Sequence, residues 1–200
     1  MHRQLVGLRF CKRLGRTQPV KISDFATQPP LIRGGCFGIL LHMKTLLIVF
    51  GAKYLIIVPL LVTLYVLYRQ QSRRRRELVL TAVIALPLTY VVARITGYFY
   101  FDPLPFVVGN FTPLIPHVAD NGFPSDHALL ATSLAALVSR FDMRWGVVLW
   151  FCAIAIGVSR VLAGVHHTID VLGGMLIASV VVIAVHTLIA RHFEKTASPE

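Results

Sequence analysis

Two short segments of this chain hold the residues best suited to chemistry. The first is Pro-Ser-Asp-His at residues 124–127, and the second is Ser159-Arg160, with His166 and Asp170 a few residues later. Each segment lies at the edge of a long apolar run. Together they supply imidazoles, a guanidinium, hydroxyls and carboxylates, which are groups that can bind a phosphate and break its ester or anhydride bond.

His166 and Asp170 are four residues apart, so they would share a face of a helix. A carboxylate in that position can accept the Nδ1 proton of the imidazole and leave Nε2 free. A neutral imidazole held in this way is a good nucleophile toward phosphorus. The alternative is a buried pair that only stabilises a helical bundle, although ionisable groups in membrane spans are costly and usually functional.

Four further residues could complete a phosphate site: Arg160, Ser159, Ser125 and His127. A guanidinium offers a planar fork to phosphate oxygens, and the hydroxyl of Ser159 can donate to the same oxygens. Ser125 precedes a helix start, where free backbone N–H groups favour an anion, and His127 is placed to protonate a leaving oxygen. The structural alternatives are an arginine that extends to lipid headgroups, a serine that caps the helix and an ordinary interfacial histidine.

Polar residues also gather in the Pro-rich segment 101–126, namely Asp102, His117, Asp120 and Asn121. They could shape the mouth of a site, but we interpret them as ordinary turn residues. We interpret His167 as a bystander, because on a helix it faces about 100° away from His166. No third His or Cys is expected at the depth of His166 and Asp170, so the sequence predicts no metal site.

The composition indicates an integral membrane protein. Of the 200 residues 56% are hydrophobic, and the mean hydropathy is +0.69, whereas soluble domains are roughly 45–50% apolar. The three cysteines show no spacing that would indicate a disulfide framework or a zinc site. The net charge of +11 could suggest nucleic acid, but no aromatic and basic module accompanies it, so we expect no nucleic-acid partner.

Five apolar runs could cross a bilayer, which is therefore an expected partner. They predict an all-α, polytopic membrane helical bundle of about five transmembrane helices. Pro59 would be tolerated in the first run as a kink. The runs are residues 45–68, 78–100, 127–141, 145–165 and 168–193.

The N-terminal segment differs in composition from the rest of the chain. Residues 1–42 hold seven Lys or Arg against one Asp, a net charge of +6, and they show no sustained helical or strand period. We predict that residues 1–42 are a disordered extension and that residues 43–200 form the membrane domain. Our hypothesis is that Met43 is the natural start of the protein.

The distribution of charge predicts the orientation of the bundle. The basic loop at residues 69–76 should be cytoplasmic, and counting spans from it places the basic residues near 140–144 and 191–195 on the same side. Residues 101–126 and 160–167 then meet on the outer face. We therefore predict a multi-pass protein of the plasma (inner) membrane whose site faces the periplasm or the cell exterior.

The motifs resemble those of the type-2 phosphatidic acid phosphatase superfamily, which are Lys-x6-Arg-Pro, Pro-Ser-Gly-His and Ser-Arg-x5-His-x3-Asp. The stretch PLIPHVADNGFPSDH is most similar to the undecaprenyl pyrophosphate phosphatases of the bacitracin-resistance type. Asp126 stands where the family usually has glycine, and the sequence leaves open whether it points away, pairs with an arginine or caps the helix. The third motif is matched in full by Ser159, Arg160, His166 and Asp170, and the second by Pro124, Ser125 and His127.

The resemblance implies a metal-independent phosphatase without a cofactor. His166 would attack phosphorus and form a phosphohistidine, Asp170 would orient it, and His127 would protonate the leaving group. Ser125 and Arg160 would hold the phosphate oxygens. The expected substrate is a lipid diphosphate, undecaprenyl pyrophosphate, which would be cleaved to undecaprenyl phosphate and phosphate at the outer membrane face.

The first motif departs from the family pattern. Gly97 falls where the lysine is expected, and Leu104 where the arginine is expected. The loss of these cations would remove at least one charge-assisted contact, worth roughly 1.5–3 kcal/mol. Arg94 could bind the substrate in their place. We therefore expect Leu104→Arg to raise kcat/KM for a lipid diphosphate, unless Leu104 lies away from the site or Arg94 already fills the role.

Other functions stay open at this point. They include a phosphatase of another lipid phosphate, such as phosphatidylglycerophosphate or phosphatidic acid, a small transporter, and a non-catalytic relative that binds lipid phosphates. Transporters tend to place ionisable groups at the membrane midplane. The charged groups here are expected near the outer ends of their spans, which favours chemistry on a headgroup.

Overall fold

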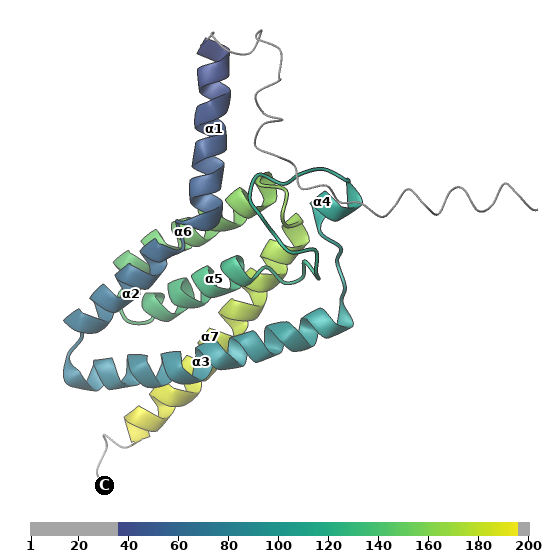
Figure 1. Cartoon of the computed structure of the whole chain (residues 1–200). Helices are drawn as coiled ribbons and strands as arrows, with labels where there is room; N and C mark the ends of the chain where they lie inside the picture. Colours follow the sequence, from purple (N-terminus) through teal and green to yellow (C-terminus); the bar gives the residue numbers. More distant parts are fainter. Residues whose placement is uncertain (1–35, 196–200) are drawn as a thin grey trace, which may run out of the picture. The chain divides into compact units, whose positions relative to one another are not determined.

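The computed structural model describes residues 36–195, which form seven helices and no β-strand. An isolated bridge between Pro103 and Asn121 is the one extended pairing in this range. The all-α prediction is therefore confirmed (Figure 1). In chain order the helices are α1 (Cys36–Lys53), α2 (Ile57–Arg69), α3 (Ser72–Phe99), α4 (Pro105–Val108), α5 (Asp126–Ser139), α6 (Met143–Leu162) and α7 (Thr168–Lys195).

The first helix begins earlier than the sequence predicted. Residues 36–42 are helical, so the expectation that they lack regular structure is wrong. The residues that follow Gly34-Gly35 are mostly apolar and include no proline before Pro59, so the helix can begin ahead of the first predicted span despite Gly38. The rest of the predicted extension, residues 1–35, lies outside the described residues.

The first predicted span is a broken helix. α1 ends at Lys53, α2 begins at Ile57, and their axes are bent by 47°. The break places Pro59 in the first turn of α2, where its missing N–H costs no hydrogen bond. The kink expected at Pro59 is therefore a short turn at residues 54–56.

α5 occupies the centre of the bundle, with α2, α3, α6 and α7 around it (Figure 1). Ten of its fourteen residues are buried. Several of these are small, including Ala128, Ala131 and Ala135, and small side chains let neighbouring helices approach closely. The most enclosed helix of the bundle thus begins at the Pro-Ser-Asp-His segment.

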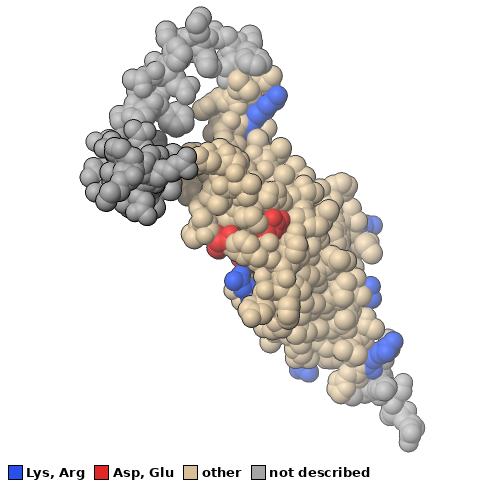
Figure 2. Space-filling model, turned by 90° about the vertical axis from the view of Figure 1, so that its right-hand side faces the viewer, with Lys and Arg blue, Asp and Glu red and all other residues tan. Residues whose placement is uncertain are grey.

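The outer surface is apolar. Val83, Phe151 and Leu176 are 65%, 70% and 66% exposed, and most of the face seen in Figure 2 carries no charge. Three helices, α3, α6 and α7, are long and apolar enough to cross a membrane, and α1 with α2 makes a fourth crossing if the bent pair counts as one. With the shorter apolar α5, these helices are consistent with the five predicted runs, and they indicate a multi-pass membrane protein.

Most of the described Lys and Arg residues, including those at 69–76, 140, 144 and 191, lie at one end of the bundle. Arg73 Nη2 donates to the carbonyl of Phe193 at 2.8 Å, which joins the start of α3 to the end of α7. At the same end His186 lies 3.3 Å from Glu77 and accepts a hydrogen bond from Arg140 Nε at 3.3 Å. The predicted site residues lie at the other ends of these helices, at the starts of α5 and α7 and at the end of α6.

Candidate active site

The link between α6 and α7 positions His166. Gly164 takes a φ of +76° in this link, a conformation that favours glycine, and a Cβ at that position would meet the ring of Phe111. The Leu114 N–H donates to the Ala163 carbonyl at 3.0 Å, so the outer loop also holds the link. These contacts bring His166 to the entrance of the bundle while leaving it 5% exposed.

Three polar groups lie next to the ring nitrogens of His166. Nδ1 lies 3.1 Å from the Gly122 carbonyl and 3.4 Å from Asp170 Oδ2, while Nε2 lies 3.2 Å from Arg160 Nη2. A carbonyl only accepts and a guanidinium only donates, so this network assigns the proton to Nδ1 and the lone pair to Nε2. The ring therefore has the tautomer that a nucleophilic Nε2 requires.

The environment of His166 keeps it neutral. Burial lowers the pKa of His166 below its usual 6.5, and the positive charge of Arg160 acts in the same direction. Asp170 opposes this change in pKa through its hydrogen bond and its negative charge. Since burial is the largest cause, the lone pair on Nε2 is available at neutral pH.

Asp170 reaches His166 by a different geometry from the one predicted. α7 begins at Thr168, so His166 precedes the helix and the two residues do not share a helical face. Asp170 instead points back past the helix start, where its Oδ2 accepts a hydrogen bond from the His167 backbone N–H at 2.8 Å, as in a capping box. Its Oδ1 is buried and has no hydrogen-bond partner among the described residues.

Ser125 is fully buried at the start of α5, and its backbone N–H donates to the Asp170 carbonyl at 3.1 Å. Its side chain makes no capping hydrogen bond, and Oγ has no partner within residues 36–195. The structural alternative of a capping serine is therefore not observed. An unpartnered buried hydroxyl beside a helix N-terminus is suited to an anion.

Arg160 is 4% exposed and so does not extend to the headgroups. Nη2 faces His166, Nη1 donates to the carbonyl of Ala52 at 3.4 Å, and Nε has no partner in the described part of the chain. Ala52 belongs to the last turn of α1, whose free carbonyls favour a cation. The break between α1 and α2 thus helps to hold the guanidinium beside the imidazole.

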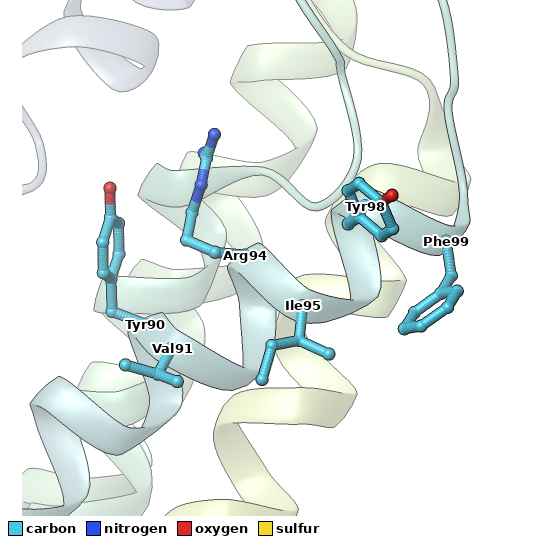
Figure 3. Close-up of a pocket in the computed structure, with 6 residues that line it drawn as sticks. All are labelled: Tyr90, Val91, Arg94, Ile95, Tyr98 and Phe99. Carbon is cyan, nitrogen blue, oxygen red and sulfur yellow. The ribbon is translucent and has the colours of Figure 1, made fainter.

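Two predicted binding residues lie elsewhere. Ser159 is half-buried and packs against Gly51 of α1, where a Cβ would collide with its hydroxyl. Arg94 lies on the exposed face of α3, 5.9 Å from the centre of the Tyr90 ring, and lines a surface pocket of about 470 Å³ (Figure 3). The structure does not bring either residue into contact with His166.

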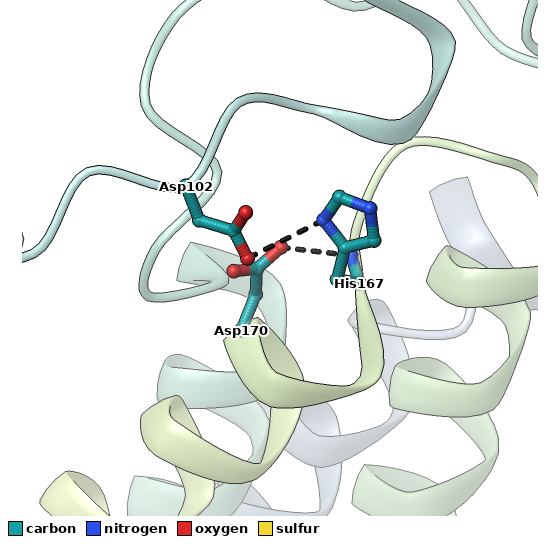
Figure 4. Close-up of side chains that lie close together, drawn as sticks. All are labelled: Asp102, His167 and Asp170. Atoms are coloured by element: carbon teal, nitrogen blue, oxygen red, sulfur yellow. Dashed lines mark hydrogen bonds and ion pairs between the residues drawn. The ribbon is translucent and has the colours of Figure 1, made fainter. Parts of the chain in front are cut away.

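A second histidine and carboxylate lie next to the first pair. His167 Nδ1 is 3.3 Å from Asp102 Oδ2, and Asp102 adjoins Asp170 (Figure 4). Burial and the negative charge of Asp170 raise the pKa of Asp102. The sequence prediction that His167 faces away from His166 assumes a helix at that position, but His167 precedes α7. Asp102, His167 and Asp170 present ligand atoms within 4.8 Å of one another, so they are the residues that could hold a cation.

The outer loop is fixed by Asn121. Its Nδ2 donates to the carbonyls of Gly97 and Tyr100 at 2.7 and 3.0 Å, and its Oδ1 accepts from the backbone N–H groups of Asp102 and Phe123 at 2.9 and 3.1 Å. These bonds set the position of Gly122, whose carbonyl faces His166. Asn121 therefore organises the site and is more than an ordinary turn residue.

The other residues that the sequence singled out take distinct positions. Leu104 is fully buried beside Gly122, and Asp126 is exposed in the first turn of α5. His127 is half-buried and interacts electrostatically with Arg160, His166 and His117. His117 was interpreted as a turn residue, yet its ring meets that of His166 edge to face, with centroids 5.4 Å apart.

Comparison with known proteins shows which family this chain belongs to. A family model described as the PAP2 superfamily matches residues 77–194, which include all the predicted site residues. The chain belongs to the PAP2 superfamily. The resemblance seen in the motifs is therefore confirmed, and PAP2 is a family of lipid phosphatases.

Two relatives in the PAP2 superfamily carry related names. The bacitracin transport permease protein BcrC of Bacillus licheniformis is 35% identical over 115 residues, 57% of this chain and 57% of that protein. Undecaprenyl-diphosphatase BcrC of Bacillus subtilis (strain 168) is 31% identical over 140 residues, 68% of this chain and 69% of that protein. The chain thus spans little more than half of the first relative's length.

A solved structure has a similar fold. The crystal structure of Aquifex aeolicus LpxE superposes with a TM-score of 0.54 at 22% identity, over 86% of this chain and 97% of that one. At this level of identity the likeness concerns the fold alone.

Proposed function

We propose that this protein hydrolyses a lipid-linked diphosphate, undecaprenyl diphosphate, to the lipid monophosphate and inorganic phosphate. The observation that carries the proposal is the arrangement around His166, with Nδ1 directed at Gly122 and Asp170 and Nε2 facing Arg160. The name of the Bacillus subtilis relative, undecaprenyl-diphosphatase, supports the choice of substrate.

In the first step the terminal phosphate binds between Arg160, the Ser125 hydroxyl and the free N–H groups at the start of α5. Arg160 moves its N–H from Nε2 of His166 to a phosphate oxygen, which frees the lone pair. Nε2 then forms a bond to phosphorus as the anhydride P–O bond breaks. His127 gives a proton to the departing oxygen of the lipid phosphate.

In the second step water attacks the phosphohistidine, and His127 takes back the proton that water loses. The N–P bond breaks, inorganic phosphate leaves, and the neutral His166 is restored. Asp170 stabilises the positive charge that the ring carries while it is phosphorylated, since its Oδ2 lies 3.4 Å from Nδ1.

A cavity beside His166 supports a substrate with a lipid chain. It has a volume of about 580 Å³ and continues from His166 along the end of α6 to Leu162, which is 58% exposed on the apolar surface. Phe111 and Leu114 of the outer loop line its other side. An isoprenoid chain could lie along these side chains while its phosphates reach His166.

The test of this function is phosphate release by the purified protein in detergent with EDTA present. Undecaprenyl diphosphate, phosphatidic acid and phosphatidylglycerophosphate are offered at equal concentrations. We expect the diphosphate to be the best substrate, and His166→Ala to lower kcat by about 10³-fold or more. Release that survives in His166→Ala, or that needs a divalent cation, would contradict the mechanism. A preference for either of the other lipids would reassign the substrate.

We further propose that the site faces the periplasm or the cell exterior, because most of the described basic residues lie at the opposite end of the bundle. Single cysteines at Val118 and Gln71, in a background where the native cysteines are replaced by serine, test this orientation. In intact cells a membrane-impermeant maleimide should label Val118→Cys and not Gln71→Cys. The reverse pattern would refute the proposed orientation.

A further inference from the structure

His117 is held in place from two sides. Leu114 donates its backbone N–H to Ala163, and Ile115 is buried against Ala163 and Val165 in the α6–α7 link. On its other side His117 contacts Phe106 of α4, with ring centroids 6.3 Å apart. These contacts fix the position of His117, which is more order than a loop that only connects two helices requires.

The free nitrogen of His117 follows from its hydrogen bond. Nδ1 lies 2.9 Å from the carbonyl of Val118, which can only accept, so Nδ1 carries a proton. Within residues 36–195 no group forms a hydrogen bond with Nε2. The edge-to-face contact, with centroids 5.4 Å apart, places the His117 ring beside the His166 ring.

The two sides of the site differ in their openness. Ser125 and Arg160 are 0% and 4% exposed, and they form the closed end that receives the phosphate under attack. His117 is only partly buried and belongs to the outer loop. The rest of the substrate must extend toward this open side, and in a diphosphate the first group beyond the attacked phosphate is the lipid-side phosphate.

We propose that His117 binds the lipid-side phosphate and makes the site selective for lipid diphosphates over lipid monophosphates. In the complex Nε2 carries a proton that is taken up together with the substrate, and it donates this N–H to an oxygen of the lipid-side phosphate. Gly97 and Leu104 stand where the family motif has a lysine and an arginine, and they cannot bind phosphate. The contact with His117 replaces part of the missing phosphate binding. The inference rests on the proposed function, because it requires that the phosphate next to His166 is the one attacked.

Farnesyl diphosphate and farnesyl monophosphate provide the test, since they differ only in the second phosphate. Phosphate release from both is measured for wild type, His117→Phe, His117→Lys and His166→Ala, with His192→Phe at the opposite end as the control. His117→Phe keeps an aromatic ring against Phe106 and His166 but loses Nε2. His117→Leu takes its place if that variant does not fold, since leucine also lacks a hydrogen-bonding group.

We expect His117→Phe to lower kcat/KM for the diphosphate by about 10- to 100-fold, mainly through KM, with little change for the monophosphate. His117→Lys should restore most of the preference, and His192→Phe should behave as wild type. An equal loss for both substrates, or an unchanged ratio, would overturn the role of His117. Failure of the proposed function would show differently, as wild type that releases no phosphate from the diphosphate or as full activity in His166→Ala.

Discussion

Gly122→Ala is the sharpest test of how the site is positioned. A Cβ at Gly122 would lie 2.9 Å from Asp170 Oδ2, 3.0 Å from the Asp102 carbonyl and 3.0 Å from Leu104 Cδ2. Ordinary contact begins at 3.4 Å, so these neighbours must withdraw by about 0.4–0.5 Å. Because the Gly122 carbonyl also holds Nδ1 of His166, the displacement reaches the nucleophile directly.

The expected cost has two parts. Overpacking should lower the free energy of unfolding by about 1–3 kcal/mol. Misplacement of the imidazole by about half an ångström should lower kcat/KM by about 10- to 100-fold. Both are measured on the same detergent preparation, by thermal unfolding and by phosphate release per folded molecule.

Gly146→Ala is the matched control. Its Cβ would lie 2.6 Å from Ser139 Cα and 2.8 Å from Ser139 Cβ, so it is at least as crowded, but it belongs to the basic end of the bundle. We expect a similar loss of stability with kcat/KM preserved per folded molecule. The reasoning fails if Gly122→Ala keeps the wild-type kcat/KM, or if Gly146→Ala loses as much activity.

Three further predictions address the binding of phosphate, the ionisation of His166 and the outer loop. Ser125→Ala removes a hydroxyl without a partner, so the free energy of unfolding should stay equal or rise, while kcat/KM should fall about 10-fold or more. A lower free energy of unfolding would mean that the hydroxyl is structural. Because burial lowers the pKa of His166, the acid limb of the kcat/KM–pH profile should lie below pH 6.5. Asp170 raises the pKa of His166, so Asp170→Asn should move the acid limb to still lower pH. A shift of the acid limb to higher pH would contradict the assignment. Leu104→Arg should lower kcat/KM and the free energy of unfolding, because Leu104 is fully buried beside Gly122 and a guanidinium there would attract the nearby Asp170 carboxylate away from His166. A rise in kcat/KM would instead support the expectation from the sequence that an arginine at 104 improves binding of the diphosphate.

The spacing of the motifs was enough to predict that His166, Asp170 and Arg160 lie together. It was not enough to predict how they meet, because the sequence does not show where a helix preceded by apolar residues begins. α7 begins two residues after His166, so both imidazoles at 166 and 167 lie outside it. That one boundary explains why the shared helical face was wrong and why His167 contacts Asp102.

Membrane helices also conceal which of their faces is buried. α3 has no charged residue from Leu78 to Ala93, so the sequence does not show which of its faces packs against the bundle; Ala93 is buried there, while Arg94, the next residue, is exposed. The same difficulty affects Ser159, whose neighbour Gly51 comes from a helix more than a hundred residues earlier. Burial periodicity, which identifies the inner face of a soluble helix, is weak when lipid replaces water.

The outer loop could be recognised as important but not interpreted in detail. Its length and polar residues suggested a functional segment. The contact of His117 with His166 depends on tertiary contacts that Leu114 and Ile115 make. A loop has no regular hydrophobic periodicity, so its sequence does not predict such contacts. In hindsight the Asn121-Gly122 pair was a signal, since a glycine is required where Asp170, Asp102 and Leu104 converge.

The side-chain hydrogen bonds of Asn121 have a consequence for the chemical ageing of the protein by deamidation. Asn followed by Gly is the dipeptide most prone to lose its side-chain amide as ammonia, and the attacking atom is the glycine nitrogen. Here that nitrogen donates to the Asp102 carbonyl at 2.8 Å, so the native fold shields the bond. Each unfolding event removes the shield, and an aspartate at 121 would have no N–H to offer Gly97 and Tyr100. Storage damage at this dipeptide should therefore be a chemical record of how often the outer loop has opened.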